Sequence, residues 1–121
     1  MKWLANASVA LVAALHFGFL ALEMFFWDHP VGRKMFEMTE EQSAFSASLA
    51  ANQGLYNGFL AVGLLWGLIA KKRDVVIFFL LCVIVAGVFG AMTAKFTIIY
   101  SQALPAVIAL GLTLLARRSA D

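Results

Sequence analysis

Residues 75–94 read VVIFFLLCVIVAGVFGAMTA, twenty positions without a single charged side chain. A helix of ~20 mostly apolar residues crosses the ~30 Å hydrocarbon core of a bilayer. The whole chain has the same character, because 63% of its 121 residues are hydrophobic and only 13% are charged. Soluble domains are about half apolar and about one quarter charged. The sequence therefore predicts a membrane protein.

Three further apolar runs flank this stretch, at about residues 3–27, 47–70 and 97–116. Very short links join the last three runs, one at residues 71–74 and one around Lys95, and short links make consecutive helices antiparallel neighbours. We expect an all-α membrane protein, an antiparallel four-transmembrane-helix bundle that forms one domain over residues 1–121. The first run is too long for a secretory signal and has no small-x-small cleavage site near its end, so it is interpreted as a retained span.

The distribution of basic residues predicts the orientation. With four spans, both termini share one side of the membrane with the 71–74 link. That side carries six of the nine basic residues and the other side carries three. The positive-inside rule therefore places both termini in the cytoplasm. The six are Lys2, Lys71, Lys72, Arg73, Arg117 and Arg118, and the three are Arg33, Lys34 and Lys95.

The connection between the first two runs is the only long one. Pro30 and Gly32 predict a turn directly after the first run. Thr39 and Gln42 then fit a capping box, the pattern in which a Thr and a Gln three residues later satisfy the first amides of a helix. The second helix is therefore expected to begin near Glu40, well before its apolar part.

Polar residues gather in the half of the spans away from the cytoplasm. At ~1.5 Å per residue from the cytoplasmic ends, His16 and Asn57 lie ~20 Å deep, and Glu23 and Asn52 lie ~30 Å deep. His16 and Glu23 are seven residues apart, so they share one face of the first helix. A carboxylate within a span is costly and usually faces a cavity or a partner.

These positions predict an outward-opening polar pocket that binds or passes a small amphiphilic or cationic ligand. Pro105 is expected to kink the fourth span beside this pocket. Four amides supply hydrogen bonds, two aromatic rings form a wall, and Glu23 supplies charge. The predicted ligand-binding residues are His16, Glu23, Trp27, Asn52, Gln53, Tyr56, Asn57, Tyr100 and Gln102.

Three alternatives stay open. Asn and Gln side chains are common interhelical contacts in membranes, and a hydrogen bond from His16 to Asn57 would be purely structural. His16 and Glu23 are also candidate catalytic residues, as an acid–base pair acting on a lipid-like substrate. The chain is otherwise an accessory subunit of a larger membrane complex. Hydrolase motifs and metal motifs are absent, and we expect no cofactor, metal or nucleic acid.

Small residues form a second pattern at helical spacing. Gly54, Gly58, Gly63 and Gly67 make two successive G-x-x-x-G pairs in the second run, and Gly87 and Gly90 lie in the third. Small residues at this spacing let helix backbones approach closely. They predict tight packing of the second span on the third, or a face for a homo-oligomer.

The sequence resembles the domain-of-unknown-function 1304 family, short bacterial four-span membrane proteins. The resemblance rests on LEMFFW in the first span, PVGRKMF in the connection, and AANQGLYNGFLA, CVIVAGVFGAMT and QALPA further on. It covers nearly the whole chain, and Ala103 stands where similar sequences often have glycine. The resemblance implies a multi-pass protein of the bacterial inner membrane and assigns no activity.

Overall fold

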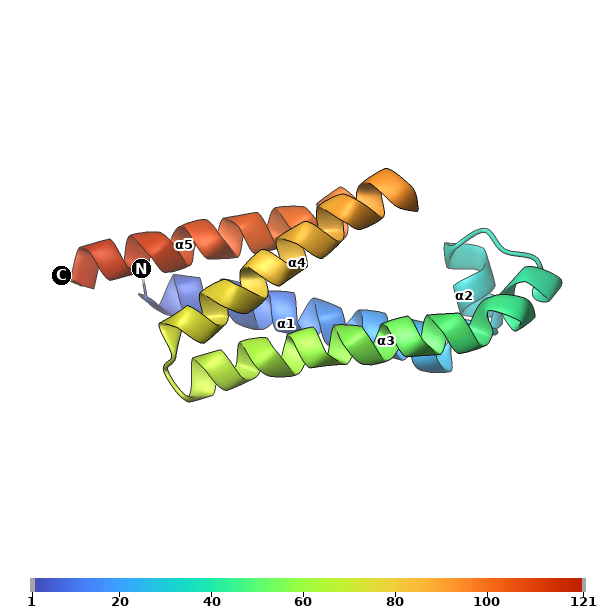
Figure 1. The fold of residues 1–121 in the computed structure, drawn as a ribbon, viewed down its shortest axis with the longest axis horizontal. Coiled ribbons are helices and arrows are strands. Elements are labelled where there is room, and N and C mark those ends of the chain that lie inside the picture. The colour runs from blue at the N-terminus through green and yellow to red at the C-terminus, as the bar shows by residue number, and fades with distance from the viewer. Residues whose placement is uncertain (1, 121) are drawn as a thin grey trace. The chain divides into compact units, whose positions relative to one another are not determined.

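The computed structural model describes residues 2–120, with side chains described as far as Ala116. This part of the chain is helical and contains no strand (Figure 1). Arg117 and Arg118, which were counted for the orientation, lie outside the described side chains. The elements in chain order are α1 (Lys2–Phe25), α2 (Pro30–Met35), α3 (Glu40–Ile69), α4 (Arg73–Thr93), the π-helix η1 (Ile99–Ala103) and α5 (Leu104–Ala120).

Within the described residues, three helical stretches are long and apolar enough to cross a membrane. They are Lys2–Phe25, Arg73–Thr93 and Ile99–Ala116. The predicted second span lies inside α3, which is long enough but less apolar, because Asn52, Gln53 and Asn57 interrupt it. The structure thus supports an all-helical membrane protein, and a membrane crossing by α3 remains a prediction.

The chain separates into two compact units. The larger unit comprises residues 1–15 and 60–121, and the smaller unit comprises residues 16–59. Both α1 and α3 are continuous helices that contribute to each unit. The prediction of a single domain is not decided by this division.

Four helices supply the core of the larger unit. Every core position is Val, Ala or Leu, so the helices pack through small and branched side chains that lose little conformational freedom on burial. The buried residues are Val9, Val12 and Ala13 from α1, Ala61 and Leu64 from α3, Val76, Leu80 and Val83 from α4, and Ala106 and Ala109 from α5.

A tight connection joins α3 to α4 in the larger unit. The Lys72 amide donates to the Gly67 carbonyl at 2.8 Å, and Lys71 takes the left-handed conformation with φ 56°. This is the Schellman arrangement that ends many helices. A Cβ at Gly67 would lie 2.6 Å from Val76 Cγ2, and one at Gly63 would overlap the Phe79 ring. These two glycines therefore let α3 and α4 pack closely.

The polypeptide between α4 and α5 departs from α-helical geometry. The Leu104 amide donates to the Ile99 carbonyl, which closes one π-helical turn immediately before Pro105. Proline has no N–H and its ring crowds the preceding turn, so the ordinary ladder cannot continue there. The irregularity expected at Pro105 therefore takes the form of a π-helical turn. A Cβ at Gly87 of α4 would lie 2.7 Å from the Ala103 backbone nitrogen in this turn.

In the smaller unit the end of α1 packs on the first half of α3. A Cβ at Gly58 would lie 2.6 Å from Leu20 Cδ1, and one at Gly54 would lie 2.7 Å from Met24 Cγ. Residue numbers rise along α1 as they fall along α3, so the two segments are antiparallel. Gly54 and Gly58 thus face α1, whereas their spacing predicted tight packing on the third span or a face for a homo-oligomer.

The predicted start of α3 is confirmed. The Gln42 amide donates to Thr39 Oγ1 at 3.1 Å, and the Thr39 amide donates to Gln42 Oε1 at 2.9 Å. This reciprocal pair is the capping box. It sets the first helical residue at Glu40.

Candidate functional site

The Glu23 carboxylate is the most distinctive group in the smaller unit. Asn57 Nδ2 of α3 donates a hydrogen bond of 2.5 Å to Glu23 Oε1 of α1, and both side chains are half-buried. Gly54, one turn before Asn57, brings α3 close to this part of α1, since its added Cβ would lie 3.1 Å from Glu23 Cβ. The glycine and the amide together hold the carboxylate between two helices.

No cation of the chain neutralises this carboxylate in the described residues. Asn57 is its hydrogen-bond partner there, and Glu23 takes part in no ion pair. An ionised carboxylate can accept about four hydrogen bonds through its two oxygens. The carboxylate therefore keeps acceptor capacity that a bound cation or hydrogen-bond donor can use.

His16 lies on the same helix but in a different setting. Its side chain is 0% exposed, and its ring makes an edge contact with Phe19 at a centroid distance of 5.1 Å. The Asn57 amide nitrogen donates to Glu23. At 1.5 Å per residue, His16 and Glu23 are ~10 Å apart along α1. Their joint action as an acid–base pair remains a prediction.

Three of the predicted ligand residues lie on the outer surface of α3. Asn52, Gln53 and Tyr56 are all exposed, and the Tyr56 ring lies 6.0 Å from the Phe59 ring. Asn57, four residues after Gln53, is the member of this stretch that turns towards α1. The side-chain amides of Asn52 and Gln53 are therefore exposed on the surface of α3.

Trp27 ties the end of α1 to α3. Its indole Nε1 donates to Ser46 Oγ at 2.8 Å, and its ring packs against the Phe36 ring at a centroid distance of 4.8 Å and a tilt of 38°. The first of these contacts occupies the indole N–H. Trp27 is thus anchored to α3 just after the end of α1, four residues beyond Glu23.

The remaining two predicted ligand residues belong to the larger unit. Tyr100 is 63% exposed and lies 6.2 Å from the Phe96 ring, and Gln102 is half-buried within η1. Their proximity to Glu23 remains a prediction.

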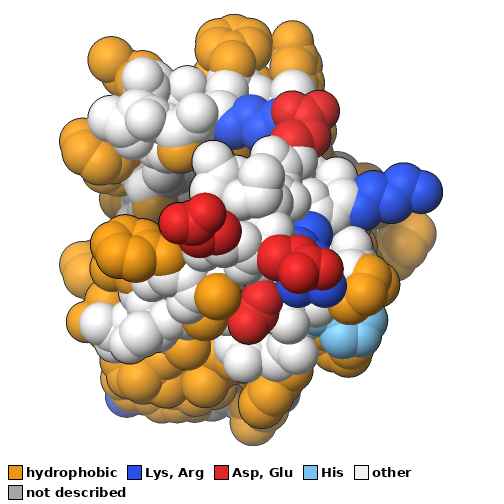
Figure 2. Space-filling view, turned by 90° about the vertical axis from the view of Figure 1, so that its right-hand side faces the viewer, with side chains coloured by type: hydrophobic (Ala, Val, Ile, Leu, Met, Phe, Trp, Pro, Cys, Tyr) orange, Lys and Arg blue, Asp and Glu red, His pale blue; other side chains and the backbone are white. Residues whose placement is uncertain are grey.

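The connection after α1 contains polar contacts that the sequence analysis missed. Arg33 Nη1 lies 3.1 Å from Asp28 Oδ1, and the fully buried Ser43 hydroxyl donates to the same oxygen at 2.8 Å. Figure 2 shows charged side chains gathered on the face that carries this connection, with hydrophobic side chains around them. The network fixes the connection to the start of α3.

The predicted turn at Pro30 is in fact the short helix α2. His29 Nδ1 accepts from the Val31 amide at 3.1 Å, and Pro30 takes the first helical position. Proline is favoured there because its fixed φ suits a helix and its missing N–H is not needed. A Cβ at Gly32 would overlap the Phe26 carbonyl oxygen. The histidine before the proline was the available sequence signal for this helix.

Two cavities in the described part of the chain lie elsewhere. Both lie in the larger unit around Lys71 and Arg73, and none of the predicted ligand residues lines them. Within the described residues, no group of three His, Cys, Asp or Glu side chains is placed to hold a metal ion. The arrangement around Glu23 suits charge pairing and hydrogen bonding.

Comparison with known proteins agrees with the resemblance seen in the sequence. A family model described as "Protein of unknown function (DUF1304)" matches residues 10–114. The uncharacterized protein YpaA of Lactococcus lactis subsp. lactis (strain IL1403) is 29% identical over 107 residues, which covers 84% of this chain and 90% of that protein. No solved structure matches.

Proposed function

The chain belongs to the DUF1304 family, and from this premise and the geometry around Glu23 we propose that it is a membrane protein that binds a small amphiphilic cation. The observation that carries the proposal is the half-buried Glu23 carboxylate, held by Asn57 and paired with no basic residue in the described part of the chain. Acidic residues within spans usually face a partner or a cavity. An ammonium or phosphonium group fits the acceptor capacity that Asn57 leaves.

For the arrangement of the protein in the membrane, we propose the topology that the sequence predicts. All four apolar runs cross the membrane as one antiparallel bundle and a single domain, with α3 as the second span and both termini in the cytoplasm. The protein is a multi-pass component of the bacterial inner membrane. In this arrangement Glu23 lies in the outer half of the bilayer, and the ligand enters an outward-opening pocket beside it.

Further predicted ligand residues of the smaller unit complete this pocket. Trp27 follows the end of α1, four residues after Glu23, and Tyr56 supplies a further aromatic ring on α3. Asn52 and Gln53 offer hydrogen bonds to the ligand, whereas Tyr100 and Gln102, which belong to the larger unit, remain predictions from the sequence. The residues of the smaller unit bind an amphiphile through one charge and several weaker contacts.

Catalysis by His16 and Glu23 is less well supported. His16 is fully buried and ~10 Å along α1 from Glu23, too far for the two to act on one proton without a bridging group. The complete burial of His16 between helices favours a structural role for this histidine.

Thermal unfolding in the presence of tetraphenylphosphonium, a lipophilic cation, tests the proposal. The purified protein is expected to gain thermal stability as the cation concentration rises, because a ligand that binds only the folded state stabilises it. Glu23→Gln keeps the carbonyl oxygen that Asn57 needs but removes the charge, so the stabilisation should disappear. Glu41→Gln, an exposed acid at the start of α3, is the matched control and should respond like the wild type.

The responses of the two variants distinguish a specific cation site from a general effect of charge. Loss of the response in Glu23→Gln alone supports the cation site. An equal response in wild type and Glu23→Gln contradicts it, and an equal loss in both variants would show a nonspecific charge effect and also contradict it.

A second candidate function rests on the outer face of α3. Asn52 and Gln53 are exposed on a helix that the proposal places in the membrane, and amides there commonly bond to neighbouring helices. This favours a homo-oligomer, or an accessory subunit in a larger complex. Disulfide crosslinking of Asn52→Cys in a Cys82→Ser background should give a dimer if two copies meet there, and Phe78→Cys on the exposed face of α4 is the control.

A further inference from the structure

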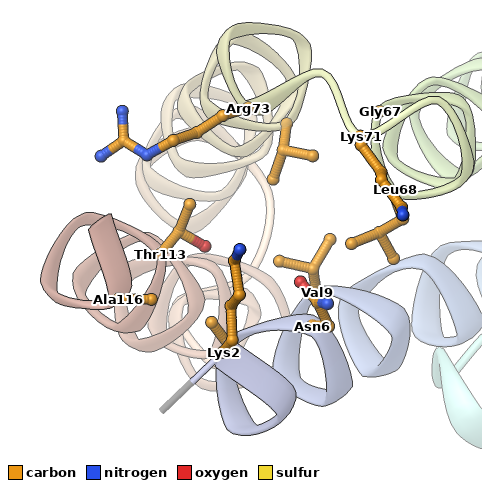
Figure 3. A pocket seen from close by; sticks show the side chains of 11 residues that line it. Lys2, Asn6, Val9, Gly67, Leu68, Lys71, Arg73, Thr113 and Ala116 are labelled. Carbon is orange, nitrogen blue, oxygen red and sulfur yellow. The ribbon is translucent and has the colours of Figure 1, made fainter. Parts of the chain in front are cut away.

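A cavity of about 480 Å³ lies in the larger unit, at the end where the α3–α4 connection is found. Figure 3 shows its lining, with Lys2 from the first turn of α1, Lys71 from the connection and Arg73 from the start of α4. Among the side chains that the structure describes, no acidic one lines it. Its volume falls in the range of about 300–1,000 Å³ that is typical of small-molecule sites.

Arg73 carries a polar atom without a partner. Its Nε is buried and has no hydrogen-bond partner in the described structure. Leaving a buried donor unsatisfied costs about 1–3 kcal/mol, and more for a charged group. A guanidinium that borders a cavity and keeps an unsatisfied donor is well suited to an anion that enters the cavity.

The backbone at this end of the unit adds to the positive character. α4 begins at Arg73, and its N-cap residue Lys72 makes no side-chain capping bond. The first amides of a helix and its dipole favour a negative group. Asp74 in the first turn of α4 lowers this potential, but it lines the neighbouring groove and not the cavity.

Lys71 occupies a position that favours glycine. Its φ of 56° lies in the left-handed region, where a side chain costs backbone energy and glycine does not. The chain nevertheless has a lysine there, and its side chain lines the cavity. The turn itself does not need a lysine. A lysine that keeps this strained conformation is expected where its ammonium group binds a ligand.

The rest of the lining is mixed. Val9, Leu68 and Val76 supply apolar surface, and Asn6 supplies an amide. The Thr113 hydroxyl already donates to the Ala109 carbonyl at 2.8 Å, so it adds no donor for an anion. A ligand with a phosphate group and an adjoining apolar part matches this division.

We propose that this cavity binds a phosphate anion through Lys2, Lys71 and Arg73. Phosphate is recognised by Arg and Lys donors together with backbone amides of a helix start. The phosphate belongs either to the headgroup of an anionic phospholipid, whose glycerol and first methylenes cover the apolar lining, or to a free phosphate ion. This site is separate from the carboxylate at Glu23 and does not depend on the function proposed for it.

Two binding experiments on the full chain distinguish the sources. In the first, the protein is placed in nanodiscs with equal phosphatidylglycerol and phosphatidylcholine, and the lipids retained on the intact protein are weighed by mass spectrometry. In the second, inorganic phosphate is titrated into protein in nanodiscs of phosphatidylcholine alone, and thermal stability is followed.

Two variants of the cavity and one control variant test whether binding depends on the basic side chains of the cavity. Arg73→Gln removes the guanidinium, and Lys71→Gly removes an ammonium while relieving the left-handed backbone, so the second variant is expected to fold at least as well as the wild type. Lys34→Gln removes an exposed charge from α2, outside the cavity, and is the control.

The wild type and Lys34→Gln should retain phosphatidylglycerol over phosphatidylcholine by at least about tenfold, which corresponds to 1.4 kcal/mol. Both cavity variants should lose most of this preference. A phosphate response without lipid preference, lost in the same variants, identifies a free phosphate site and also supports the proposal. Equal retention of both lipids without a phosphate response, or responses unchanged in the cavity variants, would overturn it.

Discussion

The amide of Asn57 on α3 donates to the carboxylate of Glu23 on α1, so the one acidic residue of the first span is held by a neutral partner from another helix. A basic partner would have cancelled the charge within the chain. An amide orients the carboxylate and leaves its charge in place. The neutral partner therefore distinguishes Glu23 from a member of a structural ion pair. The cation-binding proposal depends on this difference.

Replacing Asn57 should destabilise the protein through Glu23. Asn57→Leu removes the donor and leaves the carboxylate with no partner among the described residues, and we expect a loss of about 1–2 kcal/mol in the free energy of unfolding. The double variant Glu23→Leu with Asn57→Leu should lose less than the sum of the two single variants. Unfolding in mixed detergent micelles measures all four proteins, and strictly additive losses would show that the two side chains are not coupled.

Two glycines in different helices should respond in opposite directions to the same substitution. Gly87→Ala places a Cβ 2.7 Å from the Ala103 backbone nitrogen, which cannot move without shifting η1, so overpacking should cost about 1–3 kcal/mol. Gly111→Ala meets nothing within 4 Å and should stabilise α5 by about 0.5–1 kcal/mol. Thermal unfolding compares the two, and equal effects would contradict the close packing of α4 on η1.

The membrane crossing by α3 can be tested with single cysteines in a Cys82→Ser background. If α3 crosses, Glu41→Cys in the connection before it should react with an impermeant maleimide added outside intact spheroplasts. Lys72→Cys after α3 should react only once the membrane is opened, and Lys95→Cys should react from outside. Equal labelling of Glu41→Cys and Lys72→Cys in intact spheroplasts would show that α3 does not cross.

The sequence was sufficient for the helical class and for local start signals. An uncharged run such as residues 75–94 fits a membrane helix, and the Thr39–Gln42 capping box defines the start of α3 from side-chain chemistry alone. The family assignment was also correct, because the matching strings extend over most of the chain. Helix formation and helix starts depend on residues that are close in the sequence, so local sequence patterns predict them well.

The pairing of helices could not be predicted in the same way. Counting residues from the span ends placed Asn57 level with His16, whereas the next residue, Gly58, lies against Leu20, about one turn further along α1. Helix tilt and unequal lengths outside the membrane shift such counts. The glycine pattern likewise indicated close packing but not which neighbour each glycine faces.

The cavity at the α3–α4 connection was missed for a related reason. Its three basic residues each lie near a span end, where the positive-inside rule alone accounts for them. Lys2 is far from Lys71 and Arg73 in the sequence, and only the packing of α1 against α3 and α4 within the larger unit brings them to one cavity. A sequence pattern does not show this convergence.

Calorimetric titration of tetraphenylphosphonium into nanodisc-embedded protein tests the central claim most directly. The wild type should bind one cation per chain, and Glu23→Gln should bind at least about tenfold more weakly, the equivalent of losing 1.4 kcal/mol of charge pairing. Glu41→Gln should match the wild type. Equal affinity in the wild type and Glu23→Gln, or no binding to the wild type, would contradict the assignment of Glu23 as the charged group of a ligand site.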